Sequence, residues 1–303
     1  MLFDNVLVTG GTGFVGKNLK KIRPNWVYAS SRDYNLVDTA ECARMYADIK
    51  PTAVIHLAGL VGGIKENNSY PADFLYKNIS INTNVLHQAY EAGVTRVLSC
   101  LPTCAFPADQ KAYPFDEKSL LHGIPEETNL PFAYAKRCLY IQSNSYRKQH
   151  GLNYSCFTSS NLYGPEDNFD SEKSHFVAAL VEKLGNCNHG DQLEFWGTGK
   201  PMRQQLYVDD LVKAIPFLLQ HHNTDCPLIV SPGENLSILR MIEIGLKICK
   251  KDVKITFNNE LEGQHRKDGS NRMFLELVGD YKFTSFEEGF KKTYDWYKRG
   301  IRN

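Results

Sequence analysis

The chain has 303 residues, enough for one large domain or two closely joined domains with a substantial core. Its formal net charge of +1 gives no reason to expect nucleic acid or a membrane surface as a partner. No apolar run approaches the roughly 20 residues that span a bilayer, and the first residues do not have the pattern of a signal peptide. The 8 cysteines are scattered, without a Cys-x-x-Cys pair or a metal-site spacing, so we expect reduced thiols, no metal and a cytoplasmic location.

Short apolar runs alternate with helix-like stretches through the first half of the chain, which is the pattern of a parallel sheet with crossover helices. Buried strands are predicted at 5–9, 26–29, 53–57 and 97–100. Helices are predicted at 38–49, with Asp38 as the N-cap, and at 74–92, ending before Gly93.

After residue 165 the sequence changes to loops, short helices and isolated strands. Residues 205–220 resemble a strand followed by a helix that returns to the first domain. We therefore predict an α/β fold, a Rossmann-type doubly wound parallel sheet with a smaller interleaved C-terminal α/β domain. The first domain is predicted to comprise 1–163 with 205–225, and the second 164–204 with 226–303.

A glycine-rich turn, GGTGFVG at 10–16, follows the first strand and begins a helix. Glycine allows the backbone to turn sharply and to approach a pyrophosphate closely, and the helix N-terminus attracts the phosphates. A tight turn without a ligand is the alternative, which the position after the first strand disfavours. The predicted cofactor contacts in this turn are Gly10, Thr12, Gly13, Phe14, Val15 and Gly16.

The second predicted strand is followed by Ser30-Ser31-Arg32, where an acidic residue would hold the ribose 2′-OH of NAD. Arg32 would instead neutralise a 2′-phosphate, which favours NADP(H), unless it is only a surface arginine. Asp38 and the segment His56-Leu57-Ala58-Gly59 are predicted to line the adenine and the ribose.

Ordered short motifs along nearly the whole chain carry a family resemblance. They are 61–64 (VGGI), 67–68, 71–74 (PADF), Asn78, 104–107 (CAFP), 161–165 (NLYGP), 167–169, 174–175, 195–199 (FWGTG), Arg203 and 207–210 (YVDD). With them the chain resembles the GDP-L-fucose synthase family, bifunctional GDP-4-keto-6-deoxymannose 3,5-epimerase/4-reductases among the extended short-chain dehydrogenases/reductases. The resemblance implies a Ser, a Tyr and a Lys for ketoreduction, and a Cys and a His for epimerisation.

Two of these five positions depart from the family. Lys136 matches the family lysine, but Phe132 stands at the tyrosine and Pro102 at the serine. Four residues of helix cover ~400°, so 132 and 136 share a face, whereas two cover ~200° and turn Tyr134 away. A positioned general acid contributes ~10²–10⁴ in rate, so the loss of the phenol hydroxyl is expected to disable reduction. Phenylalanine has no proton to donate.

The epimerisation pair is retained. The resemblance implies that Cys104 is the base and His175 the acid, and a thiol base works best with a pKa lowered toward neutrality. The enolate places charge on O4, so its stabilisation needs backbone N–H groups, Thr103 or water in place of the missing hydroxyls.

The resemblance also implies a substrate site, with Arg203 and Lys267 as partners of the pyrophosphate. Trp196 is expected to shape the sugar-nucleotide pocket or, equally, to pack in the core. Glu262 replaces an aspartate in the segment that leads to Lys267. The predicted substrate-binding residues are Thr103, Asn161, His175, Trp196, Arg203 and Lys267. Helices at 74–92 and 132–149 would form a homodimer interface.

The favoured hypothesis is an epimerase acting at C3 and/or C5 of a GDP-4-keto-6-deoxy sugar, with NADP(H) retained and ketoreductase activity lost or very weak. Such an enzyme would need a separate downstream reductase. The first alternative is a complete GDP-L-fucose synthase that uses NADPH. The second is a non-catalytic sensor that binds NADP(H) and the GDP sugar.

Overall fold

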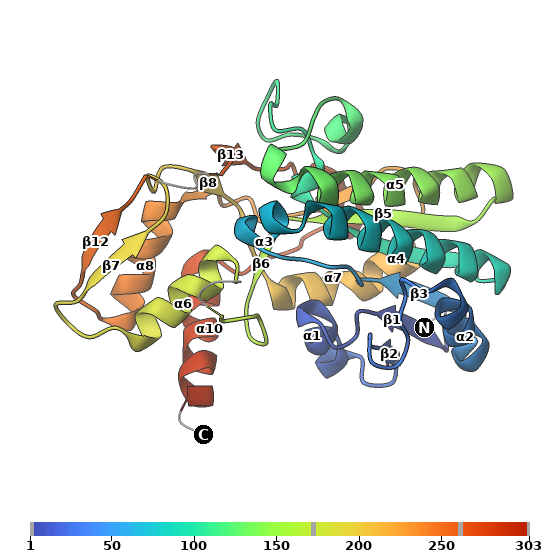
Figure 1. Cartoon of the computed structure of the whole chain (residues 1–303), viewed down its shortest axis with the longest axis horizontal. Helices are drawn as coiled ribbons and strands as arrows, with labels where there is room; N and C mark the ends of the chain where they lie inside the picture. The colour runs from blue at the N-terminus through green and yellow to red at the C-terminus, as the bar shows by residue number, and fades with distance from the viewer. Residues whose placement is uncertain (1–2, 171–173, 260–262, 302–303) are drawn as a thin grey trace.

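A six-stranded sheet forms the centre of the computed structural model, which describes residues 3–170, 174–259 and 263–301 (Figure 1). The strand order is β10-β5-β4-β3-β1-β2, and neighbouring strands are parallel. The strands are β1 (Val6–Thr9), β2 (Val27–Ala29), β3 (Ala53–His56), β4 (Arg96–Pro102), β5 (Asn153–Ser159) and β10 (Leu228–Val230). The predicted Rossmann-type sheet and its first four strands are confirmed, with β4 extending two residues farther than expected.

Helices cover both faces of this sheet. α2 (Thr39–Ile49), α4 (Pro71–Glu91) and α5 (Leu130–His150) pack on one face, and α1 (Phe14–Ile22), α7 (Val208–His221) and α9 (Arg272–Val278) on the other (Figure 1). Strand residues alternate between the two cores: Leu7 and Val54 face one, Val8 and Ile55 the other. The predicted α2 and α4 are confirmed, although α4 begins three residues earlier because Pro71 is favourable in the first turn.

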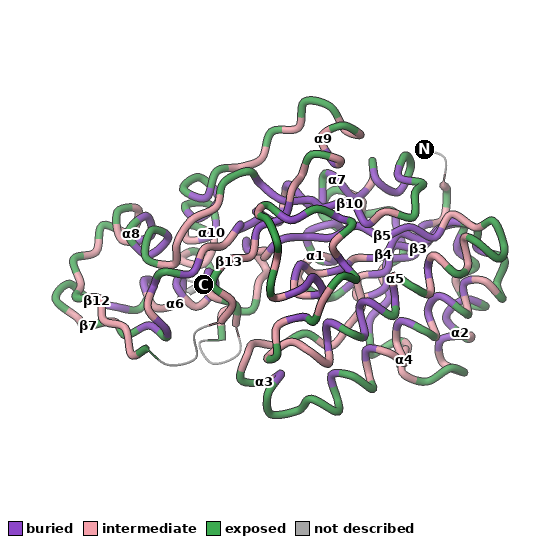
Figure 2. Tube along the Cα trace, turned by 90° about the horizontal axis from the view of Figure 1, so that it is seen from above, coloured by how far each residue is buried: buried purple, intermediate pink, exposed green. Residues whose placement is uncertain are grey.

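A smaller unit lies beside the carboxyl ends of the central strands, on the left of Figure 1. It has its own apolar core, to which Leu180, Phe195, Ile242 and Phe290 contribute. Its elements are α6 (Phe176–Asn186), β7 (Gln192–Phe195), α8 (Ile238–Cys249), β12 (Lys254–Phe257) and α10 (Phe286–Ile301). The two units are interleaved in the chain, as the colours of Figure 1 show, and the strands of the central sheet are largely buried (Figure 2).

The chain returns to the first unit twice. α7 packs against α1, as predicted for residues 205–220. The predicted boundary at 226 is wrong, because β10 pairs with β5 and Phe274 of α9 is fully buried in the core beneath the sheet. All three residues of the apolar run Leu228–Val230 are buried, because β10 joins a sheet that has helices on both of its faces.

Short elements connect the two units. They are α3 (Ile64–Ser69), η1 (Thr103–Ala105), η2 (Glu117–Leu121), η3 (Glu127–Asn129), β6 (Asn161–Tyr163), β8 (Met202–Arg203), β9 (Gln205–Tyr207), β11 (Leu236–Ser237) and β13 (Arg266–Lys267). β6 pairs with β9, and β8 pairs with both β11 and β13. All 8 cysteines are free. Within the described ranges, no helix is long and apolar enough to cross a membrane, and no cluster of metal-ligating side chains occurs.

Candidate active site

The glycine-rich turn between β1 and α1 lies tightly against the end of β3. Gly10 has a φ of +72°, and a Cβ on it would come within 2.9 Å of the Ala58 nitrogen. A Cβ on Gly16 would come within 2.5 Å of the Gly10 carbonyl oxygen, so only glycine fits at this position in the first turn of α1. Gly13 is the N-cap of α1 and provides no capping side chain. The turn therefore presents a helix N-terminus, which suits the binding of a pyrophosphate.

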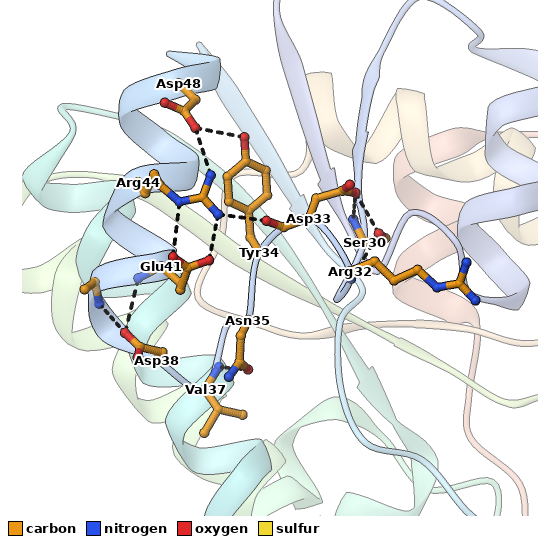
Figure 3. Close-up of polar contacts among 11 residues, drawn as sticks. Ser30, Arg32, Asp33, Tyr34, Asn35, Val37, Asp38, Glu41, Arg44 and Asp48 are labelled. Atoms are coloured by element: carbon orange, nitrogen blue, oxygen red, sulfur yellow. Dashed lines mark hydrogen bonds and ion pairs between the residues drawn. The ribbon is translucent and has the colours of Figure 1, made fainter.

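The loop after β2 contains a basic side chain suited to a second phosphate. Figure 3 shows Arg32 extending away from the neighbouring network, whereas Arg44 is engaged by Glu41 and Asp48. The carboxylate of Asp33 turns back and accepts from the nitrogen and the hydroxyl of Ser30, at 3.1 and 2.6 Å (Figure 3). These hydrogen bonds lower the pKa of Asp33. The acidic residue of this loop is thus bound to its own loop, and the exposed Arg32 is the group available to a 2′-phosphate.

Two predicted cofactor contacts have local roles in the structure. The Asp38 carboxylate accepts from the nitrogens of Ala40 and Glu41 as the N-cap of α2, so its predicted contact with adenine stays a prediction (Figure 3). The expectation that His56 lines the cofactor is wrong, because its ring is completely buried between β1 and α4.

A directed chain of hydrogen bonds runs through His56. Asn82 Nδ2 donates to the carbonyl of Ala135 over 3.1 Å, so Asn82 Oδ1 is the acceptor for His56 Nε2 at 3.0 Å. Burial together with the Lys136 charge lowers the pKa of His56 to about 3, so the imidazole is neutral. Its Nδ1 then accepts from the Thr9 hydroxyl at 2.8 Å. The chain joins β1, β3, α4 and α5.

Lys136 follows Ala135 on α5 and is buried. Its Nζ lies close to Gly59, where a Cβ would come within 3.4 Å of it. As predicted, Phe132 shares this face: its ring is 7 % exposed, and Lys136 Nζ lies 5.8 Å from the ring centroid. Tyr134 is 41 % exposed and packs against Arg137 instead, so its hydroxyl does not replace the missing phenol.

The predicted catalytic and anion-binding groups meet between the two units. The charge of Lys267 affects the pKa of both Cys104 and His175, and Arg203 affects that of Lys267. Lys267 and Arg203 are register partners on β13 and β8. The structure therefore brings Cys104 of η1, His175 at the start of α6 and Arg203 of β8 each within electrostatic range of Lys267.

The Cys104 thiol does not have the lowered pKa that best suits a base. Burial raises the pKa of this thiol and outweighs the lowering by Lys267 and Lys136. His175 lies at the surface of the site, yet the loss of surrounding water and the nearby Lys267 lower its pKa. At neutral pH the sulfur therefore keeps its proton, and the imidazole is neutral.

The other predicted substrate residues lie on both sides of this site. Thr103 is buried next to Cys104, and Asn161 is partly buried at the start of β6. Trp196 is 51 % exposed, so the alternative that it packs in the core is wrong: Phe195, on the other side of the strand, fills that place. Glu262 lies outside the described residues.

Sequence reasoning missed Glu126, whose charge raises the pKa of Cys104 and of Lys267. Its carboxylate is held by the nitrogen of Thr128 and the amide of Asn129. The signal was a capping pattern, Glu-Glu-Thr-Asn, directly before α5. It also missed Asn82, which was detectable because Asn78 and Asn82 interrupt the apolar face of a long helix at a spacing of four.

Comparisons with known proteins agree with this geometry. The model of the NAD dependent epimerase/dehydratase family matches residues 6–231. The chain is 34 % identical to a probable GDP-L-fucose synthase of Drosophila melanogaster, with 96 % of each chain covered. It is 36 % identical to the GDP-L-fucose synthase of Dictyostelium discoideum, covering 96 % of this chain and 94 % of the relative. A GDP-L-fucose synthetase structure from Naegleria fowleri, bound to NADP, superposes with a TM-score of 0.91 at 32 % identity, covering 99 % of this chain and 94 % of that one.

Replacing Arg32 should change the preference between cofactors. We expect Arg32→Gln to weaken NADPH binding by ~10–100-fold, because a charge-assisted hydrogen bond to a phosphate contributes about 1.5–3 kcal/mol. NADH binding should change little. Fluorescence titration of both cofactors measures the two dissociation constants. The control is Arg44→Gln, which removes an arginine already engaged by carboxylates. An equal loss of NADPH and NADH affinity in Arg32→Gln would contradict the assignment.

The buried neutral His56 should make stability depend on pH. Its pKa is lowered from 6.5 to about 3, so the unfolded chain binds the extra proton first and stability falls as the pH drops from 6.5 toward 3. His222, lowered to about 4, acts in the same direction. Each should contribute a slope of up to about 1.4 kcal/mol per pH unit to the unfolding free energy.

Urea unfolding between pH 6.5 and 4.5 measures this slope. His56→Gln should lose the part due to His56, while His122→Gln, at an exposed position, should keep the full slope. A His56→Gln slope equal to that of the unsubstituted chain would show that His56 is not held neutral.

Proposed function

Because this chain belongs to the GDP-L-fucose synthase family, within the NAD dependent epimerase/dehydratase family, we propose that it epimerises C3 and/or C5 of a GDP-linked 4-keto-6-deoxy sugar. The observation that supports the proposal is that the Lys267 charge acts on both Cys104 and His175. The GDP-sugar class is supported by the names of the relatives.

The pair has the protons that epimerisation needs. The 4-keto group acidifies the hydrogens at C3 and C5, so a base can remove one and leave an enolate with its charge on O4. Moving the single shared proton from the Cys104 thiol to the His175 imidazole gives a thiolate base and an imidazolium acid. The thiolate then takes the carbon-bound proton, and the imidazolium returns one to the opposite face. Lys267 stabilises the thiolate and, with Arg203, is positioned to bind the diphosphate.

The residues around the first turn fit NADP(H). The Gly10–Gly16 turn, the N-terminus of α1 and the exposed Arg32 would hold its phosphates, and Lys136 beside Gly59 would hold the nicotinamide ribose. When bound, NADPH supplies hydride for reduction at C4. Lys136 is buried beside the Phe132 ring, at a position that suits this contact.

The two leading hypotheses differ only in the reductive step. The names of the relatives favour the alternative, a complete GDP-L-fucose synthase that uses NADPH. The site of this chain provides the observation that favours lost or very weak reduction: the buried face of α5 places a Phe132 ring beside Lys136, where a proton donor is required. If reduction is lost, a separate downstream reductase is needed.

A second copy of the chain is the proposed partner of α4 and α5. These helices pack together and expose large apolar side chains, which suits burial in a homodimer. The exposed residues are Leu75, Tyr76, Tyr134 and Ile141. The cytoplasmic location stays a prediction.

Hydrogen exchange tests the epimerase step. In D₂O with GDP-4-keto-6-deoxymannose, we expect deuterium to enter C3, C5 or both, detected by mass spectrometry and NMR. Cys104→Ala should reduce the rate by ~10²–10⁴-fold, because it removes the positioned base. Cys138→Ala changes an exposed cysteine on α5 and is the matched control. If the unsubstituted protein shows no exchange, the proposal is wrong.

Substrate-dependent oxidation of NADPH tests the reductive step. We expect the unsubstituted protein to be slow, and the double variant Phe132→Tyr/Pro102→Ser to gain ~10²–10⁴-fold, because it restores the general acid and its neighbouring hydroxyl. Phe132→Leu/Pro102→Ser, which restores no phenol, is the control. Rapid oxidation by the unsubstituted protein would instead establish the complete synthase.

A further inference from the structure

The enolate of the proposed reaction lacks an obvious hydroxyl donor. Its O4 carries the negative charge, and a preorganised donor is the usual means of stabilising such an oxygen. Pro102, the last residue of β4, has neither a side-chain hydroxyl nor a backbone N–H. The donor must therefore come from another element at the same edge of the sheet.

Ser159 occupies the matching position on the neighbouring strand. β4 and β5 are parallel, and Pro102 is the register partner of Ser159. Adjacent strands lie ~4.8 Å apart, and paired residues project from the same face of a sheet. The Ser159 hydroxyl is thus about one strand spacing from the side chain at 102, on the same side.

This hydroxyl is buried but only weakly engaged. Ser159 is 7 % exposed, and its hydroxyl lies 3.9 Å from the Cys100 sulfur. Cys100 precedes Pro102 by two residues on β4, and the charge of Lys136 lowers the pKa of its thiol against the effect of burial. Ser159 therefore lies at the edge of the sheet within reach of the Lys136 charge, with a proton that is not committed to a strong hydrogen bond.

The neighbouring hydroxyls are placed less well. Thr158 has a buried hydroxyl without a hydrogen-bond partner, but it alternates with Ser159 and projects from the opposite face. The Ser160 hydroxyl is also buried without a partner, but Ser160 follows the end of β5 and is not the register partner of Pro102. Thr103 belongs to the 3-10 turn that carries Cys104 and so lies beside the proposed base.

We propose that Ser159 donates its hydroxyl hydrogen bond to O4 of the sugar enolate, as a further catalytic residue that supplies from β5 what Pro102 cannot supply from β4. The inference rests on the proposed epimerisation and names a group that stabilises its intermediate. Ser159 gives up no proton to carbon, because Cys104 and His175 carry out both transfers.

Deuterium wash-in from D₂O into GDP-4-keto-6-deoxymannose tests the proposal. Ser159→Ala should lower the maximal exchange rate by ~10²–10³-fold, the usual cost of removing one oxyanion donor, with little change in the substrate concentration for half-maximal rate. Thr158→Val, the next residue on the other face, should exchange normally. Cofactor titration and thermal melting should show that both variants are folded.

Moving the hydroxyl between strands separates catalysis from structure. Ser159→Ala/Pro102→Ser should recover exchange to within about tenfold of the unsubstituted protein, since one donor at this edge is sufficient for the oxyanion. Should that double variant not fold, Ser159→Thr, which keeps a hydroxyl, is expected to retain exchange. Full exchange in Ser159→Ala overturns the inference, as does an equal loss in Thr158→Val. No exchange in the unsubstituted protein refutes the proposed function instead.

Discussion

The hydrogen-bond chain from Thr9 through His56 and Asn82 to Ala135 holds the site together. It connects the strand before the glycine-rich turn with the helix turn that carries Lys136. Burial keeps the imidazole neutral, and with Nε2 donating to Asn82 this gives the chain a single direction. Because the chain is completely buried, breaking it would leave unsatisfied groups, a cost of about 1–3 kcal/mol each. The buried hydrogen-bond chain therefore fixes the distance between the glycine-rich turn and Lys136.

This rigidity bears on the proposal that reduction is lost while proton transfer is kept. The position of Lys136 is set by α5 and by the hydrogen bond to the carbonyl of Ala135. A phenylalanine four residues earlier therefore removes a proton donor without moving the lysine. Cys104, His175 and Lys267 come instead from η1, α6 and β13, where the smaller unit meets the sheet. Substitutions on the buried face of α5 therefore act on the hydride step first, and on proton transfer only through charge at O4.

Periodicity and motif spacing predicted the sheet, the first turn and the face shared by Phe132 and Lys136, because these depend on local geometry. They failed where distant segments meet. β10 has three apolar residues that read like any short strand, and only its pairing with β5 places it in the first unit. The direction of the Cys104 pKa shift depends on how much water the fold removes around the thiol, which no local pattern records.

The register between strands is likewise not visible in the sequence, and it changes the interpretation of Pro102. In the sequence, Pro102 and Phe132 are two positions of one active site at which a hydroxyl is missing. In the sheet, Pro102 lies beside Ser159, so the edge of the sheet retains a hydroxyl on the same face. A phenol has no such neighbour, since Tyr134 points to the surface. On this proposal the two substitutions are unequal: Ser159 would replace the serine hydroxyl from an adjacent strand, whereas Tyr134 cannot replace the phenol on α5, so proton transfer would be kept where reduction is lost.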